Sequence, residues 1–156
     1  MSDSNTPVGE IRGVLLPLHS GQLLLPNASV SEVAGYHPPE PVSDAPEWLL
    51  GLLDWRQYQI PVVSFDALVE SGPAQPAKRA RLAVCNTLGG NPKRPFIGVV
   101  LTSMPRLVKV TEDVIMPMAK PQELGPTVKR QVMINGEEAW IPDLNALEWE
   151  VQEALS

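Results

Sequence analysis

The sequence predicts a mainly β protein with two similar small lobes and one helix at its C-terminus. Three observations support this fold class. Proline makes up 17 of the 156 residues, about twice the usual share of roughly 5%, and each proline disrupts a helix because it lacks a backbone donor. Short apolar or alternating segments lie between turn signals, as is typical of strands. A helical period begins only after Asp143, where apolar residues recur every three to four positions.

The predicted elements follow in order along the chain. His19-Ser20-Gly21 is the turn of a first hairpin, and Asn135-Gly136 is the strongest hairpin signal of all. The final helix has Asp143 as its N-cap. Strands are expected over 13–18, 21–25, 28–33, 51–55, 59–65, 81–85, 96–101, 106–110, 129–134 and 138–141.

One pattern occurs twice, at an offset of 79 residues. A strand, a tight turn and a second strand end in Phe65-Asp66-Ala67-Leu68, and the same order ends in Leu144-Asn145-Ala146-Leu147. We therefore expect a disordered tail at 1–9 and a single domain over 10–156. Within that domain we expect lobe one at 11–70, a linker at 71–77, lobe two at 78–142 and the helix at 143–155.

Composition argues against several classes of protein. A net charge of −6 and a pI near 4.9 disfavour nucleic-acid binding, which normally uses a basic surface. The single cysteine, Cys85, excludes an internal disulfide. No apolar run is long enough to span a membrane, and the first residues lack the basic start of a leader. We expect a soluble cytoplasmic protein without membrane insertion.

The sequence contains no pattern that indicates catalysis or metal binding. His19 and His37 both lie in predicted loops and lack the spacing of metal ligands. Neither a nucleophile-elbow motif nor a glycine-rich phosphate loop is present. We therefore expect that the protein is not an enzyme and uses no cofactor and no metal.

The segment from Val30 to Phe65 contains a distinctive order of motifs. These are Val30-Ser31-Glu32-Val33, then Ala45-Pro46-Glu47-Trp48, Gly51-Leu52-Leu53-Asp54-Trp55-Arg56 and Ile60-Pro61-Val62-Val63. The order resembles the CheW-like family of bacterial chemotaxis coupling proteins, with its motifs V-x-E-V, A-P-x-aromatic, G-(V/L)-I-N-L-R-G and I-P-V-(V/I)-D-L. Weaker similarity extends the resemblance over roughly 11–147.

The resemblance implies two five-stranded, SH3-like β-barrel lobes and a scaffold function. Members of the family link the cytoplasmic tips of methyl-accepting chemoreceptors to the regulatory domain of a CheA-type histidine kinase, and they catalyse no reaction. By resemblance, Arg56 and Val30 contact the receptor, with Glu32, Asp54 and Trp55 beside them. The expected location is the cytoplasm, at membrane-associated receptor arrays.

The chain departs from the family pattern at three places. Gln57 replaces the glycine after the arginine, which predicts a different backbone conformation of the turn. Asp54 and Trp55 replace Asn-Leu, so that Asp54 is expected to pair with Arg56. Thr102 stands where an aspartate is common. These departures resemble the accessory CheW-like proteins of type IV pilus systems, which control twitching motility.

A second hypothesis belongs to a different class. Trp48, Trp55, Tyr58 and Trp140 would line an apolar pocket in a small β-barrel ligand sensor, although strand aromatics more often fill a core.

Overall fold

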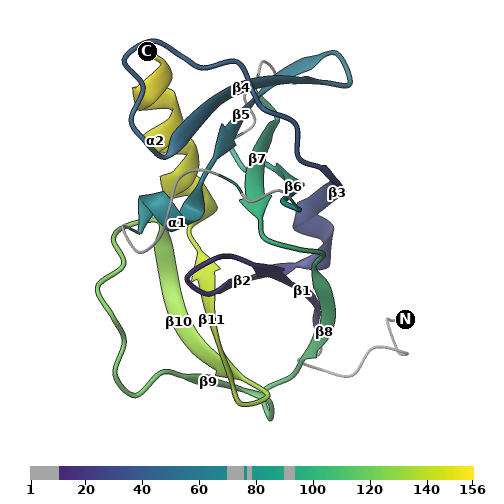
Figure 1. Ribbon diagram of the computed structural model, residues 1–156. Coiled ribbons are helices and arrows are strands. Elements are labelled where there is room, and N and C mark those ends of the chain that lie inside the picture. Colours follow the sequence, from purple (N-terminus) through teal and green to yellow (C-terminus); the bar gives the residue numbers. More distant parts are fainter. Residues whose placement is uncertain (1–10, 70–75, 77–78, 90–93) are drawn as a thin grey trace.

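The computed structural model describes residues 11–69, 76, 79–89 and 94–156. The predicted tail and all but one residue of the predicted linker lie outside these ranges. Over the described part of the chain there are eleven strands, two α-helices and one short 3-10 helix, η1. The strands form two sheets, one above the other in Figure 1.

Sheet A has six strands and sheet B has five. Sheet A has the order β8 (Arg106–Val110), β1 (Ile11–Pro17), β2 (Gln22–Pro26), β11 (Glu137–Pro142), β10 (Val128–Ile134) and β9 (Ile115–Pro117). Sheet B has the order β3 (Val30–Gly35), β6 (Arg81–Asn86), β7 (Phe96–Leu101), β5 (Tyr58–Val63) and β4 (Leu49–Trp55). The helices are η1 (Asn27–Ser29), α1 (Phe65–Leu68) and α2 (Leu144–Leu155).

The predicted fold class is confirmed in its main features. The chain is mainly β, and α2 begins after Asp143, whose Oδ1 accepts a hydrogen bond from the Ala146 amide at 3.0 Å. The expectation of five strands in each lobe holds for sheet B, whereas sheet A carries a sixth strand, β9, at its edge. That strand has only three residues, too few to show an alternating pattern in the sequence.

The sequence repeat is present in the structure at the level of single residues. The offset of 79 residues maps the turn Arg56-Gln57 onto Asn135-Gly136 and β5 onto β11. It also maps the N-cap Ser64 onto the N-cap Asp143. Each half of the chain therefore ends in the same unit of hairpin, N-cap and helix.

The two halves do not each form one sheet, which corrects the predicted lobes. The β1–β2 hairpin belongs to sheet A, while β3, β4 and β5 of the same half belong to sheet B. In the second half, the β6–β7 hairpin joins sheet B and the remaining strands join sheet A. The two parallel contacts, β2 with β11 and β7 with β5, hold the exchanged hairpins in place. Local patterns predict a hairpin, but only long-range burial decides which sheet it joins.

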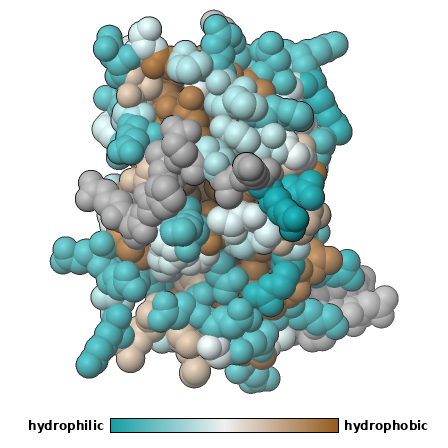
Figure 2. Space-filling model, viewed as in Figure 1, coloured by the Kyte–Doolittle hydropathy of each residue, from teal (hydrophilic) through white to brown (hydrophobic). Residues whose placement is uncertain are grey.

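Each sheet curls around its own apolar cluster, and a larger core lies between the sheets. Leu15, Leu24 and Ile134 belong to the cluster of sheet A, and Ile60 and Leu82 belong to that of sheet B. The central core contains residues of both sheets together with α1 and α2. On the face shown in Figure 2, hydrophobic residues surface in separate areas among hydrophilic ones.

A close backbone contact fixes the curl of sheet B. Glu40 follows β3, and its amide and carbonyl bond to the carbonyl and amide of Leu52 in β4 at 2.8 and 2.9 Å. This bridge joins the two edges of the sheet. It requires glycine at position 51, where φ is +150° and a Cβ would lie 2.2 Å from the Glu40 carbonyl oxygen.

We expect Gly51→Ala to lower the free energy of unfolding by about 1–3 kcal/mol, because the methyl group strains the backbone and separates the Glu40–Leu52 bridge. Gly35→Ala is the matched control, since no atom lies within 4 Å of a Cβ at that strand position. Urea unfolding of both variants measures the difference. Equal stabilities would show that the bridge tolerates a side chain at position 51.

Candidate functional site

The turn between β4 and β5 holds Arg56 in a conformation that few side chains adopt. Arg56 has φ 46° and Gln57 has φ 71°, and positive φ at both central residues is characteristic of a type I′ hairpin turn. Gln57 thus adopts the left-handed conformation that glycine favours. The equivalent turn, Asn135-Gly136, has the same signs of φ with residues that suit them better.

A bulge in β3 brings Glu32 to this turn. Val30 pairs with Cys85 and Glu32 with Val84, so two steps along β3 correspond to one step along β6. Cys85 belongs to the central core and Val84 to the cluster inside sheet B, so Val30 and Glu32 face opposite ways. A regular strand would have placed both on one face, whereas the two successive polar residues Ser31-Glu32 interrupt the alternation of apolar and polar residues at the bulge.

The Arg56 guanidinium lies between a carboxylate and an aromatic ring. Its Nη2 donates to Glu32 Oε1 at 2.5 Å, and its Cζ lies 4.9 Å from the centre of the Trp55 ring. The Arg56 side chain is 70% exposed and that of Glu32 is 32% exposed. The guanidinium is thus held from two sides while most of it still faces solvent. The predicted partner, Asp54, is exposed on β4, and the ion pair forms with Glu32 in its place.

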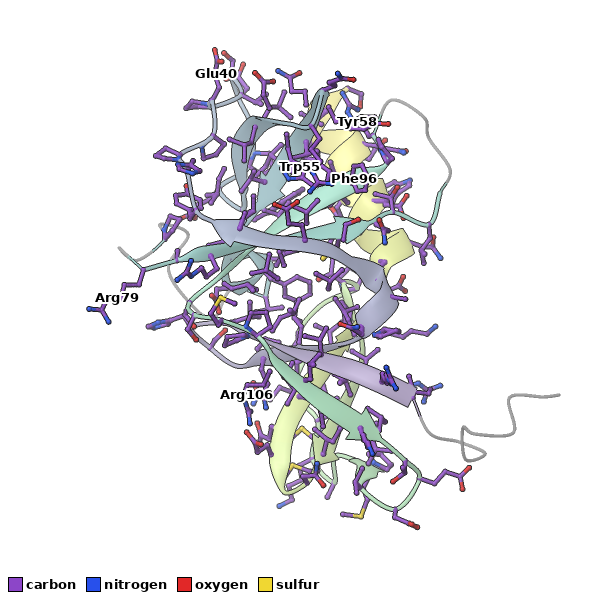
Figure 3. All side chains as sticks on the ribbon, turned by 90° about the vertical axis from the view of Figure 1, so that its right-hand side faces the viewer. Glu40, Trp55, Tyr58, Arg79, Phe96 and Arg106 are labelled. Atoms are coloured by element: carbon purple, nitrogen blue, oxygen red, sulfur yellow. The ribbon has the colours of Figure 1, made fainter. Side chains whose placement is uncertain are left out.

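The Trp55 ring that lies against this arginine belongs to a cluster of three aromatic rings. The Phe96 ring centre lies 4.9 Å from that of Trp55 and 5.3 Å from that of Tyr58, both edge-on. Figure 3 shows the three rings together. Tyr58 remains 40% exposed, which is high for a large aromatic side chain. We call these rings, with Arg56 and Glu32, the sheet B mouth, because they lie at one open end of the curled sheet.

The aromatic residues of the ligand-sensor hypothesis do not share a pocket. Trp140 is buried in the central core and Trp48 packs against that core, whereas Trp55 and Tyr58 lie at the sheet B mouth. The structure therefore offers no aromatic-lined cavity from these four residues.

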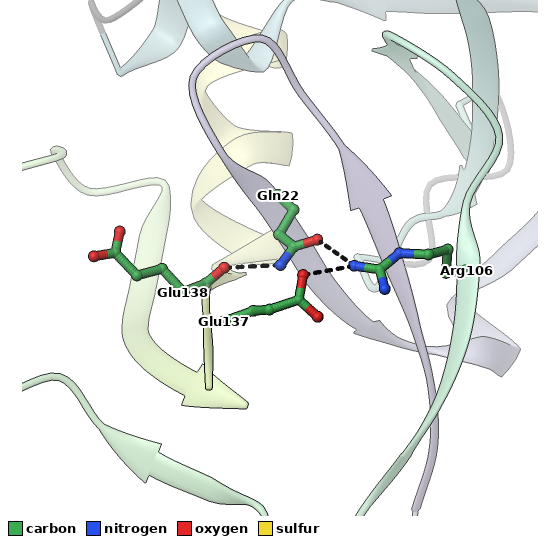
Figure 4. A network of polar contacts seen from close by, with 4 residues as sticks. All are labelled: Gln22, Arg106, Glu137 and Glu138. Carbon is green, nitrogen blue, oxygen red and sulfur yellow. Dashed lines mark hydrogen bonds and ion pairs between the residues drawn. The ribbon is translucent and has the colours of Figure 1, made fainter. Parts of the chain in front are cut away.

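Sheet A has an equivalent open end, the sheet A mouth, and its contacts are polar. Arg106 donates to Glu137 Oε1 at 2.8 Å and to Gln22 Oε1 at 3.3 Å, while Gln22 donates to the Glu138 carbonyl at 2.9 Å (Figure 4). The hydrogen bond from Arg106, and then its charge, hold the pKa of Glu137 below its ordinary value.

Comparison of the two mouths shows which one is suited to bind a partner. Gln22 and Phe96 each begin the second strand of an exchanged hairpin. Glu137 and Tyr58 each begin the strand that follows the repeated turn. At both pairs of positions sheet A has a polar residue and sheet B an aromatic one. Exposed aromatic rings beside an arginine are typical of protein interfaces. The sheet B mouth is therefore the candidate site.

The structure brings together three of the five residues that the resemblance indicated. Arg56, Glu32 and Trp55 are in contact at the sheet B mouth. Asp54 is exposed on β4, the strand that also carries Trp55, and Val30 is half-buried against the central core. Sequence reasoning did not include Phe96, because its place beside Trp55 depends on the hairpin exchange.

The described residues offer no group of three histidine, cysteine, aspartate or glutamate side chains that could hold a metal ion. In the same part of the chain, no helix has the length and apolar character needed to cross a membrane. Cys85 is buried, and burial raises the pKa of its thiol to about 12.

Comparison with known proteins identifies the family. Residues 12–150 match the CheW-like domain family. The chain is 24% identical over 103 residues to a probable chemotaxis protein CheW of Rhizobium etli, an alignment that covers 66% of this chain and 61% of that protein. Its fold is similar to that of the scaffolding protein TtCheW from Thermoanaerobacter tengcongensis, with a TM-score of 0.75, 18% identity, and coverage of 92% of this chain and 90% of that one.

Because the family match extends over most of the chain, the protein belongs to the CheW-like domain family. This confirms the resemblance drawn from the motifs between Val30 and Phe65. Membership of this family agrees with the prediction that the chain is not an enzyme.

We expect Gln57→Gly to raise the free energy of unfolding by about 1 kcal/mol, because glycine adopts the positive φ without strain. The equivalent reverse change, Gly136→Gln, should lower it by a similar amount. Chemical denaturation of both variants tests the pair. A loss of stability in Gln57→Gly would contradict a strained turn.

We expect the Glu137 carboxyl to titrate below an ordinary glutamate and to return toward the ordinary pKa in Arg106→Gln. A carboxyl whose pKa is depressed in the folded state contributes stability above its unfolded pKa, and this contribution is lost as the pH falls through the folded pKa. Carbon-detected NMR titration measures both values. An unchanged midpoint in Arg106→Gln would exclude the ion pair as the cause.

Proposed function

We propose that the protein is a non-catalytic scaffold that couples the cytoplasmic tips of methyl-accepting chemoreceptors to the regulatory domain of a CheA-type histidine kinase. The observation that supports this most directly is the sheet B mouth, where Arg56 is both exposed and held in place. Family membership supports the two partners. The proposal places the chain in the cytoplasm, at receptor arrays.

The chemistry of the sheet B mouth suits a partner with an acidic group next to an apolar side chain. A guanidinium carries five donors in a planar fork, and Glu32 accepts from only one nitrogen of Arg56. The remaining donors can bind a carboxylate or the carbonyl groups at a helix end. The exposed part of Tyr58 then offers apolar area beside the charge.

Within this proposal the five residues have different roles. Arg56 contacts the receptor, Trp55 supports its guanidinium and Glu32 fixes its direction. Asp54 is exposed on β4 next to Trp55, so an acidic partner group is favoured at Arg56 and disfavoured at Asp54. Val30 contributes through its packing against the central core.

We further propose that the chain serves a type IV pilus system rather than flagellar swimming. The departures Asp54, Trp55 and Gln57 from the N-L-R-G pattern, and Thr102 in β7's following turn, support a specialised adaptor. Deletion of the gene should abolish twitching and leave swimming intact. Loss of swimming alone would overturn this assignment.

We expect Arg56→Ala to weaken binding to a purified receptor cytoplasmic fragment by about tenfold or more, because the main charged contact is lost. Arg106→Ala is the matched control: it removes the arginine of the equivalent ion pair at the sheet A mouth. Biolayer interferometry measures both, and thermal unfolding shows whether each variant is folded. A folded Arg56→Ala protein with unchanged affinity would remove Arg56 from the interface.

Capture of the tagged protein from its native cells tests the proposed partners. We expect both a chemoreceptor and a CheA-type kinase among the proteins identified by mass spectrometry. Recovery of neither, under conditions in which a known adaptor retains its partners, would contradict the proposed function.

A further inference from the structure

Two buried carboxylates lie outside the candidate site and form unusually complete contacts. Asp66, on α1, is 7% exposed. Its Oδ2 accepts from the His19 amide at 3.0 Å, and its Oδ1 accepts from the Ser20 amide at 2.8 Å and from the Ser20 hydroxyl. Both oxygens of this side chain therefore bind the turn of the β1–β2 hairpin.

Glu148, on α2, makes the same kind of contact in the other half of the chain. It is also 7% exposed. Its Oε2 accepts from the Leu88 amide at 2.6 Å and its Oε1 from the Gly89 amide at 2.8 Å. These amides belong to the loop that follows β6, so this carboxylate binds the β6–β7 hairpin.

Both contacts cross from one sheet to the other. Asp66 follows β5 of sheet B and binds a hairpin of sheet A, whereas Glu148 follows β11 of sheet A and binds a hairpin of sheet B. In each case the carboxylate and the hairpin come from the same half of the chain. Figure 1 shows α1 and α2 on the same side of the molecule. The two contacts, which we call the carboxylate latches, thus join the sheets at two places, one in each half of the chain.

A carboxylate is an expensive side chain to bury, since an ionised group loses its hydration. An apolar residue would bury as much surface against a loop. A carboxylate that accepts two amide hydrogen bonds also fixes the orientation of the loop, because both oxygens must meet their donors at once. The latches therefore fix the orientation of each hairpin against the helix of the opposite sheet.

We propose that Asp66 and Glu148 are positioning residues that set the angle between the two sheets and thereby transmit receptor binding to kinase control. This inference rests on the proposed function, in which the scaffold engages two partners. A partner at the sheet B mouth is held at a defined angle to the surfaces of sheet A by the central core together with the two latches. Opening a latch reduces coupling between the partners without removing either binding surface.

Three variants open the latches in different ways. Asp66→Asn and Glu148→Gln remove the charge with little change of shape. Gly89→Ala acts from the loop, because a Cβ there would lie 2.6 Å from Glu148 Oε1 and displace the carboxylate. Glu148→Gln and Gly89→Ala act on the same latch, so their combination should have no larger effect than either change alone. Val132→Ala, inside the cluster of sheet A, is the control for a general loss of stability.

The first measurement is the relative orientation of the sheets, from residual dipolar couplings of backbone amides in weakly aligned protein. We expect one alignment tensor to fit both sheets in the parent and in Val132→Ala. In each latch variant we expect the tensors of sheets A and B to differ. If one alignment tensor fits both sheets in all three latch variants, the inference is overturned, regardless of the affinities for the two partners.

The second measurement is receptor-dependent kinase activity in reconstituted arrays. We expect a latch variant to reduce it by about fivefold while the separate affinities for receptor fragment and kinase domain stay close to those of the parent. An equal reduction in Val132→Ala, or full activity in the latch variants, overturns the transmission role. If the parent itself binds neither partner, the proposed function fails, and the orientation measurement still decides whether the latches position the sheets.

Discussion

The exchange of hairpins between the two halves of the chain is the constraint on which the rest of the structure depends. Each sheet combines a hairpin from one half with strands from the other, so neither half can complete a sheet alone. The parallel pairing of β2 with β11 and of β7 with β5 holds each exchanged hairpin in its sheet. The central core forms between the sheets as a result, and α1 and α2 both pack into it. Folding of either sheet is therefore coupled to folding of the other, since the contacts that define each one are distant in sequence.

The same exchange creates two equivalent open ends with different chemistry. An arginine and a glutamate pair across both of them, but the order is reversed: Arg56 lies on a hairpin turn and Glu32 on an edge strand, whereas Arg106 lies on an edge strand and Glu137 on a hairpin. Aromatic rings support one pair and an amide side chain supports the other. A near-symmetric framework thus presents two unlike surfaces, which is what a scaffold for unlike partners requires.

Features that depend on neighbouring residues could be predicted from the sequence, and features that depend on distant contacts could not. The turn at Asn135-Gly136, the N-cap at Asp143 and the repeat offset all follow from local chemistry. The sheet that each hairpin joins does not follow from local chemistry, because a hairpin has the same pattern of apolar and polar residues in either sheet. The bulge beside Glu32 was also missed, although the two successive polar residues Ser31-Glu32 interrupt the alternation of a regular strand. The candidate site was found through its motifs, and its aromatic part was incomplete without the three-dimensional arrangement.

Magnitudes indicate how the Arg56 turn is kept in an unfavourable conformation. A side chain with left-handed φ costs about 1–2 kcal/mol, and both Arg56 and Gln57 have one. An edge-on aromatic pair contributes about 0.5–1.5 kcal/mol beyond burial, and an exposed cation over a ring about 0.5–1 kcal/mol. The contacts of Trp55 with Phe96 and Arg56 are therefore of the size needed to offset much of this strain. Because the ring contacts also restrict the guanidinium before any partner binds, less conformational entropy is lost on binding. Trp55, which replaces the family leucine, thus has two effects. It stabilises the turn, and it restricts the Arg56 guanidinium before a partner binds.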